Sequence, residues 1–125
     1  MPRKKKQNPT ELLSECIVDA LLDKKAFNPV IIDFSKLYNT ICDLFIICHS
    51  SSRVQSEAIS DAIIVNAKKI AGQSPIHREG YENAEWILID YGDIIVHIFQ
   101  EQTRKFFNLE QLWADAEIRQ VNLPQ

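Results

Sequence analysis

Two apolar runs in the second half of the chain constrain its fold more than any other feature. Residues 86–90 and 94–99 each have the β-branched and aromatic composition of a strand, and Tyr91-Gly92-Asp93 separates them. That spacing predicts a hairpin or another tight connection. Alternate residues of the second run point to opposite faces, Ile94, Val96 and Ile98 to one and Ile95, His97 and Phe99 to the other. Because both faces are mostly apolar, we expect a central strand with helices on both sides of its sheet.

Capping and breaking residues predict two helices before this pair of strands. Thr10 can cap a first helix, whose apolar residues recur at helical spacing until Asn28-Pro29 interrupts the pattern. Ser52 and Gln55 have the spacing of a capping box, in which a hydroxyl and an amide side chain satisfy free N–H groups at a helix start. The second helix that they predict ends at Gly72, a natural C-terminal stop.

Shorter signals complete the predicted fold. Apolar runs at residues 30–32 and 44–48 predict two further strands, and Leu109, Leu112 and Trp113 mark a short last helix. The predicted order is helix–strand–strand–helix–strand–strand–helix. This is an α/β fold, a single small domain with a mixed sheet flanked by helices.

The chain is expected to form one domain and two tails. Its 125 residues suit a single domain, to which we assign residues 10–118. We expect residues 1–9 to form a basic, flexible N-terminal tail and residues 119–125 a C-terminal tail. The cluster from Arg3 to Lys6 is the one locally nucleic-acid-like segment, although a solvated tail has the same composition.

Charge and hydropathy limit the class of partner. With 14 basic and 17 acidic residues the net charge is −3, which argues against nucleic-acid binding by the whole surface and favours contact with a basic protein. No apolar run approaches the roughly 18 residues of a membrane span, and no secretory signal follows the basic N-terminus. We therefore expect a cytoplasmic protein without a membrane partner.

The cysteines argue against a metal site. Cys16, Cys42 and Cys48 are an odd number in apolar surroundings, which predicts buried thiols in a reducing compartment. Cys42, Cys48 and His49 lack the ligand spacing of a zinc site. We therefore predict neither a metal ion nor another cofactor.

Several blocks of the sequence match one family. The stretch 86–99 (Trp-Ile-Leu-Ile-Asp-Tyr-Gly-Asp-Ile-Ile-Val-His-Ile-Phe) resembles its signature, 43–55 is similar to its strand and Ser-rich turn, and Glu79-Gly80 looks like its Glu-Gly pair. The closing pattern resembles it at Arg104, Phe107, Leu109, Glu110, Leu112 and Trp113. The blocks stand in the family's order from about residue 10 to residue 116, which makes the match specific. By this resemblance the chain is identified as a member of the ribosomal silencing factor family, RsfS or Iojap.

The resemblance implies a fold and a function. The fold is nucleotidyltransferase-like without a catalytic site. The implied function is binding to the large ribosomal subunit through the ribosomal protein numbered fourteen, on the face that meets the small subunit. A factor bound there blocks subunit joining and represses translation, and homodimers are seen among family members. Contact between ribosomal RNA and the basic tail is a further expectation.

The 86–99 hairpin matches the partner-binding region of the family, and we predict its contact residues there. They are Trp86, Tyr91, Gly92, Asp93 and Phe99. Aromatic residues at strand ends often anchor interfaces because they provide large contact area at low entropic cost. Full burial of Tyr91 is not expected at a turn. Core packing is the alternative role of the three aromatic residues.

Two other functions stay open: a nucleotide-binding or nucleotidyltransferase enzyme, and an RNA-binding assembly factor for the large subunit. Two-metal phosphoryl transfer needs carboxylates that converge on one side, whereas Asp90 and Asp93 stand three positions apart across a turn. Ser50-Ser51-Ser52 could hold an anion at a helix start, but helix capping is the favoured role. We expect His97 to be a hydrogen-bonded structural residue and predict no catalytic residue.

Overall fold

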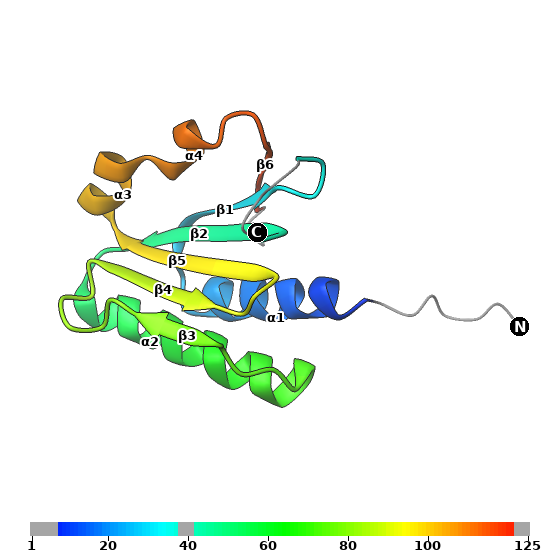
Figure 1. Ribbon diagram of the computed structural model, residues 1–125. Helices are drawn as coiled ribbons and strands as arrows, with labels where there is room; N and C mark the ends of the chain where they lie inside the picture. The colour runs from blue at the N-terminus through cyan, green and yellow to red at the C-terminus, as the bar shows by residue number, and fades with distance from the viewer. Residues whose placement is uncertain (1–7, 38–41, 122–125) are drawn as a thin grey trace, which may run out of the picture.

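The computed structural model describes residues 8–37 and 42–121, which form three layers (Figure 1). Helices α1 (Pro9–Asp23) and α2 (Arg53–Asn66) cover one face of a sheet, and α3 (Glu101–Phe107) and α4 (Leu109–Leu112) lie on the other. Helix α2 continues into a π-helical turn, η1 (Ala67–Ala71), which ends at left-handed Gly72, as predicted. Within the described ranges, no helix has the length and apolar character needed to cross a membrane.

The described strands form one six-stranded sheet in the order β3-β4-β5-β2-β1-β6. The strands are β1 (Phe27–Asp33), β2 (Leu44–Ser50), β3 (His77–Glu79), β4 (Trp86–Asp90), β5 (Ile94–Gln100) and β6 (Glu117–Gln120). Strands β2 and β5 run parallel, and the other neighbouring pairs are antiparallel, so the sheet is mixed. The prediction of a central strand at 94–99 is confirmed, since β5 lies between β4 and β2.

The two faces of β5 pack into two separate cores. Ile94, Val96 and Ile98 pack with the buried residues of α1 and α2. Ile95 and Phe99 pack on the opposite face, beneath α3 and α4. This division follows from the two-residue period of a strand and confirms the predicted alternation. The prediction of buried free thiols is also confirmed for the three cysteines.

The N-cap of α1 lies two residues before Thr10, the predicted cap. Asn8 is its N-cap, and the Asn8 side chain accepts a hydrogen bond of 2.8 Å from the N–H of Glu11. Pro9 then occupies the first helical position, where its fixed φ suits a helix and its missing N–H costs nothing. Thr10 instead donates its hydroxyl to the Asp93 carboxylate at 3.1 Å.

Asn28-Pro29 lies inside β1 and forms a bulge there. The pairing of β1 with β2 shifts register between Phe27 and Val30, and Asn28 has a φ of 45°. A bulge leaves a residue outside the ladder, which is where a strand tolerates proline. The interruption seen in the sequence is therefore a bend within a strand, since α1 has already ended at Asp23.

Three elements were not predicted: β3, α3 and β6. The residues of β3 and β6 are all exposed and mostly polar, so they lack the apolar alternation that marks a strand. Strand β6 pairs with β1, from Glu117 opposite Asp33 to Gln120 opposite Val30. The boundary that we assigned between residues 118 and 119 falls inside this strand. The basic cluster from Arg3 to Lys6 lies outside the described residues.

Candidate functional site

Three aromatic residues form an exposed surface where β4 begins and α3 ends. Phe106 is 81% exposed and Phe107 47% exposed, and Trp86 is half-buried beside them. The ring centroids of Trp86 and Phe107 lie 4.7 Å apart, and those of Phe106 and Phe107 lie 5.0 Å apart. We call Trp86, Phe106 and Phe107 the aromatic surface. Clustered exposed aromatic rings are typical of protein-binding sites.

Phe99 supports this surface from below. It pairs directly with Trp86 across β4 and β5, and the two ring centroids lie 4.9 Å apart. Phe99 is 1% exposed, so it belongs to the core under α3. Two of the predicted site residues are thus in contact, but only Trp86 reaches the surface.

His97 contacts Trp86 through a hydrogen bond. The indole N–H of Trp86 donates to Nδ1 of His97 at 3.0 Å. Burial lowers the pKa of His97 to about 4, so the ring is neutral at physiological pH. Since Nδ1 accepts, the proton must lie on Nε2, which has no hydrogen-bond partner among the described residues. The prediction of a hydrogen-bonded structural histidine is confirmed at Nδ1.

Buried Arg104 fixes α3, which carries two of the three surface rings. Its guanidinium donates to His49 Nδ1 at 2.9 Å and to the carbonyl of Phe27 at 3.3 Å. Its Nε also lies 3.4 Å from a carboxylate oxygen of Glu110. Burial first, and then the charge of Arg104, lower the pKa of His49. His49 therefore stays neutral and accepts, which ties the end of β2 to α3.

The predicted turn residues lie elsewhere. Tyr91 is 6% exposed and packs in the core under α1 and α2, so the expectation that it avoids full burial is wrong. The turn position exposes the backbone, but the side chain follows the pleat toward the helices. Burial raises the pKa of Tyr91 to about 12, and its hydroxyl has no partner among the described residues.

Gly92 and Asp93 are exposed and shape the turn itself. Gly92 has a φ of 90°, and its N–H donates to the Asp90 carboxylate at 2.7 Å. The Asp93 carbonyl accepts from the N–H groups of Asp43 and Leu44, which joins the turn to β2. Trp86 begins β4 and Tyr91 directly follows its last residue, so the two lie roughly 16 Å apart at the usual rise of a strand. The structure therefore divides the five predicted residues into two groups.

The Ser-rich turn caps α2. Ser52 accepts from the N–H of Gln55 at 3.0 Å, as the capping box predicts. Gln55 does not complete the box, because its Oε1 accepts from the N–H and hydroxyl of Ser51 instead. Ser50 donates to the carbonyl of Ser52 at 2.9 Å and also bonds the hydroxyl of Ser56. The serine hydroxyls thus serve local structure, which supports the capping role over anion binding.

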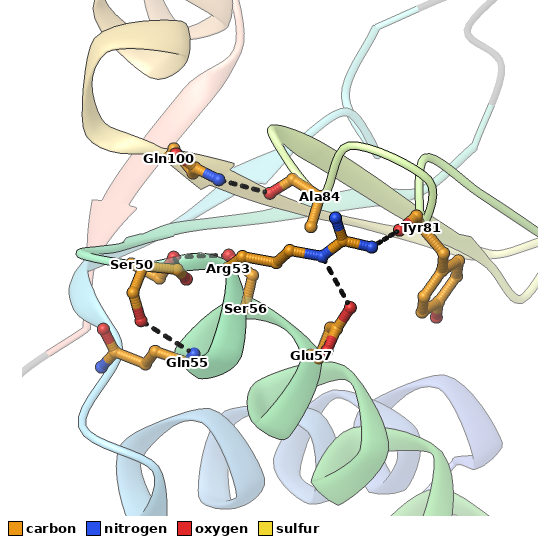
Figure 2. Close-up of polar contacts among 9 residues, drawn as sticks. Ser50, Arg53, Gln55, Ser56, Glu57, Tyr81, Ala84 and Gln100 are labelled. Carbon is orange, nitrogen blue, oxygen red and sulfur yellow. Dashed lines mark hydrogen bonds and ion pairs between the residues drawn. The ribbon is translucent and has the colours of Figure 1, made fainter.

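Further polar contacts join α2 and the end of β5 to the connection between β3 and β4. Figure 2 shows Arg53 reaching from α2 to the carboxylate of Glu57 and to the carbonyl of Tyr81. The side chain of Gln100, at the end of β5, donates to the carbonyl of Ala84 at 3.1 Å. These bonds fasten the connection between β3 and β4 and thereby the start of β4.

The carboxylates at the turn also have structural partners. Asp90 accepts from Gly92 and Asp93 accepts from Thr10, so each stabilises the turn or α1. In residues 8–37 and 42–121, no group of three or more His, Cys, Asp or Glu side chains is placed to hold a metal ion.

Comparison with known proteins identifies the family. A family model described as ribosomal silencing factor during starvation matches residues 6–125. The ribosomal silencing factor RsfS of Halalkalibacterium halodurans is 41% identical over 107 residues, which span 83% of this chain and 87% of that protein. RsfS of Bacillus subtilis is 35% identical over 100 residues, 80% of this chain and 83% of that protein.

A solved structure has the same fold. The crystal structure of a protein from Chromobacterium violaceum matches with a TM-score of 0.79 and 28% identity, and the match covers 95% of this chain and 98% of that chain. Sequence and fold agree with the resemblance carried by the 86–99 hairpin. The chain belongs to the RsfS family of ribosomal silencing factors.

Proposed function

We propose that this protein binds the large ribosomal subunit through the ribosomal protein numbered fourteen, on the intersubunit face, and sterically blocks association with the small subunit. Membership of the RsfS family supports ribosome association in general. The observation that carries the finer proposal is the aromatic surface. It offers large rings, one of them 81% exposed, on elements that Arg104 and His97 hold in place.

The chemistry of this surface suits a protein partner. Aromatic anchors surrounded by packed neighbours contribute much of the binding energy at protein interfaces. The chain as a whole carries a net charge of −3, which complements the basic character of a ribosomal protein. Trp86 is the proposed central anchor, with Phe99 as its support. Gly92 and Asp93 are proposed as a second, smaller contact, and Tyr91 as the residue that holds their turn from inside.

Co-sedimentation with purified large and small subunits tests the proposal. The protein should pellet with large subunits and not with small ones, and it should reduce the yield of joined ribosomes. Phe106→Ala and Trp86→Ala should each weaken binding by about 2 kcal/mol or more, a factor of roughly thirty. Phe106 is the cleaner variant, because a side chain that is 81% exposed contributes little to folding.

A matched control is available on the opposite layer. Val65, on α2, is 64% exposed and lies on the face away from α3. Val65→Ala should bind and block joining like the unaltered protein. Equal binding to both subunits, or equal loss in the Val65 and Phe106 variants, would contradict the proposal. Deletion of residues 1–6 at two salt concentrations measures any contribution of RNA contact.

A further inference from the structure

We infer that His97 is a positioning residue for Trp86: its neutral ring holds the indole in the orientation that the docking surface needs, and protonation of that ring releases it. The inference rests on the proposed function only for its effect on binding. The link between the two side chains stands on the geometry alone.

Ring contacts alone do not fix the orientation of the Trp86 indole. Trp86 contacts the rings of Phe99 and Phe107 at centroid distances of 4.9 Å and 4.7 Å, both in tilted arrangements. Aromatic pairs accept more than one arrangement, offset-stacked or edge-to-face, over centroid distances of about 4.5–7 Å, so they constrain the indole less strictly than a hydrogen bond does. A hydrogen bond is directional, so the 3.0 Å bond to His97 Nδ1 selects one orientation.

The imidazole is otherwise an unfavourable choice at this position. His97 is 4% exposed and lies against the ring of Phe45, with centroids 4.5 Å apart. Its Nε2–H has no hydrogen-bond partner among the described residues, and an unpaired buried donor costs about 1–3 kcal/mol. A phenylalanine would fill the same space without that cost. What the imidazole adds is an acceptor for the indole.

Protonation removes this acceptor. A doubly protonated imidazole donates from both nitrogens, so Nδ1 can no longer accept from the indole N–H. The rings that face His97 come from β2 (Phe45), β4 (Trp86) and β5 (Phe99). Burial alone accounts for the low pKa of His97, with no contribution from a charged neighbour. Protonation of His97 should therefore free the indole of Trp86.

Indole N–H resonances in a ¹⁵N-labelled protein test the inference directly. The chain has two tryptophans, Trp86 and Trp113, so the second is an internal reference. His97→Phe keeps the ring shape but removes the acceptor, and it should shift the Trp86 resonance strongly and speed its hydrogen exchange. His97→Asn, whose amide oxygen can accept, should restore part of both properties. In the unaltered protein, the Trp86 resonance should titrate with a midpoint well below 6.5.

Measurements of large-subunit binding distinguish a positioning role of His97 from a general role in the fold. His97→Phe should weaken large-subunit binding roughly fivefold, the usual contribution of one hydrogen bond. In a Trp86→Phe background, which lacks the indole N–H, the same change should have no further effect. An additive loss there would mean that His97 supports the fold and does not position Trp86.

The two proposals fail in distinguishable ways. An unshifted Trp86 resonance in His97→Phe overturns the positioning role, whatever the binding result. A shifted resonance with unchanged binding in both Trp86→Ala and His97→Phe leaves the positioning intact and overturns the docking surface. If His97→Phe does not fold, the titration of the unaltered protein decides, and a Trp86 resonance that ignores His97 protonation rejects the inference.

Discussion

Gly80 lies against the carbonyl group of Trp86 so closely that no other residue fits there. A Cβ at Gly80 would be 1.9 Å from the carbonyl oxygen of Trp86 and 2.9 Å from its carbonyl carbon. Gly80 also has a φ of 90°, which L side chains rarely adopt. The glycine that follows β3 therefore allows the chain to pass close to the first residue of β4, which carries the indole.

Gly80→Ala should destabilise the protein by more than about 2 kcal/mol, because backbone strain and a backbone clash add together. Urea unfolding measures the change. Gly72→Ala is the matched control: Gly72 also has a positive φ, 67°, but a Cβ there meets nothing within 4 Å. Gly72→Ala should cost only about 1–2 kcal/mol, from the positive φ alone. Equal costs at the two sites would contradict the close approach.

Tyr91 should behave as a core residue. Tyr91→Ala should cost about 3–5 kcal/mol of stability, because a large buried ring is lost. Tyr91→Phe removes a buried hydroxyl without a described partner, so it should unfold at the same temperature as the unaltered protein or higher. Thermal unfolding and large-subunit binding should be measured on both variants. Loss of binding by a stable Tyr91→Phe would show that the hydroxyl has a role outside the core.

Arg104 should stabilise α3 far more than the neighbouring Lys105. Arg104→Met leaves His49 and Glu110 without their buried partner and should cost about 3 kcal/mol, with binding reduced because α3 loosens. Lys105 is exposed and pairs with Glu101 at 3.1 Å on the surface. Lys105→Met should therefore change stability by less than about 1 kcal/mol. Comparable unfolding midpoints for the two variants would contradict the role of Arg104 in holding α3.

Acid should destabilise the protein through His97. Its pKa is near 4 when folded and 6.5 at its ordinary value, so the unfolded chain takes up the proton first as pH falls. Stability should fall between about pH 6.5 and pH 4, by on the order of 3 kcal/mol from this group. His97→Phe should flatten that part of the stability profile. An unchanged slope in the variant would assign the acid sensitivity to other groups.

The central strands were predictable because their signal is local. Strand β5 is apolar on both faces, and only a central position buries both. Trp86 and Phe99 were predictable partners for the same reason, since strand register places them side by side. Strand β6 carries no such signal: its residues are exposed, and its pairing with β1 joins positions more than 80 residues apart, such as Val30 and Gln120.

Two features of the candidate site, the burial of Tyr91 and the exposure of Phe106, could not be predicted from local sequence. The direction of a side chain at a turn is not encoded by its position alone, so exposure of Tyr91 was wrongly expected. Phe106 was missed because α3 has only seven residues and no apolar repeat of its own. Its exposure is a tertiary property, set by Arg104 holding the helix over β2. Contacts distant in sequence decided both cases.

Strand β6 also has a consequence for aggregation. Without it, β1 would be the edge of the sheet, and its run Val30-Ile31-Ile32 would offer unpaired backbone groups beside apolar side chains, a template for pairing with another copy. Instead the edge presents Glu117, Arg119 and Gln120 to water. A polar strand of four residues thus acts as a guard against edge-to-edge association. A truncation that removes β6 would leave the aromatic surface intact but would expose the backbone groups of β1 to pairing with another copy.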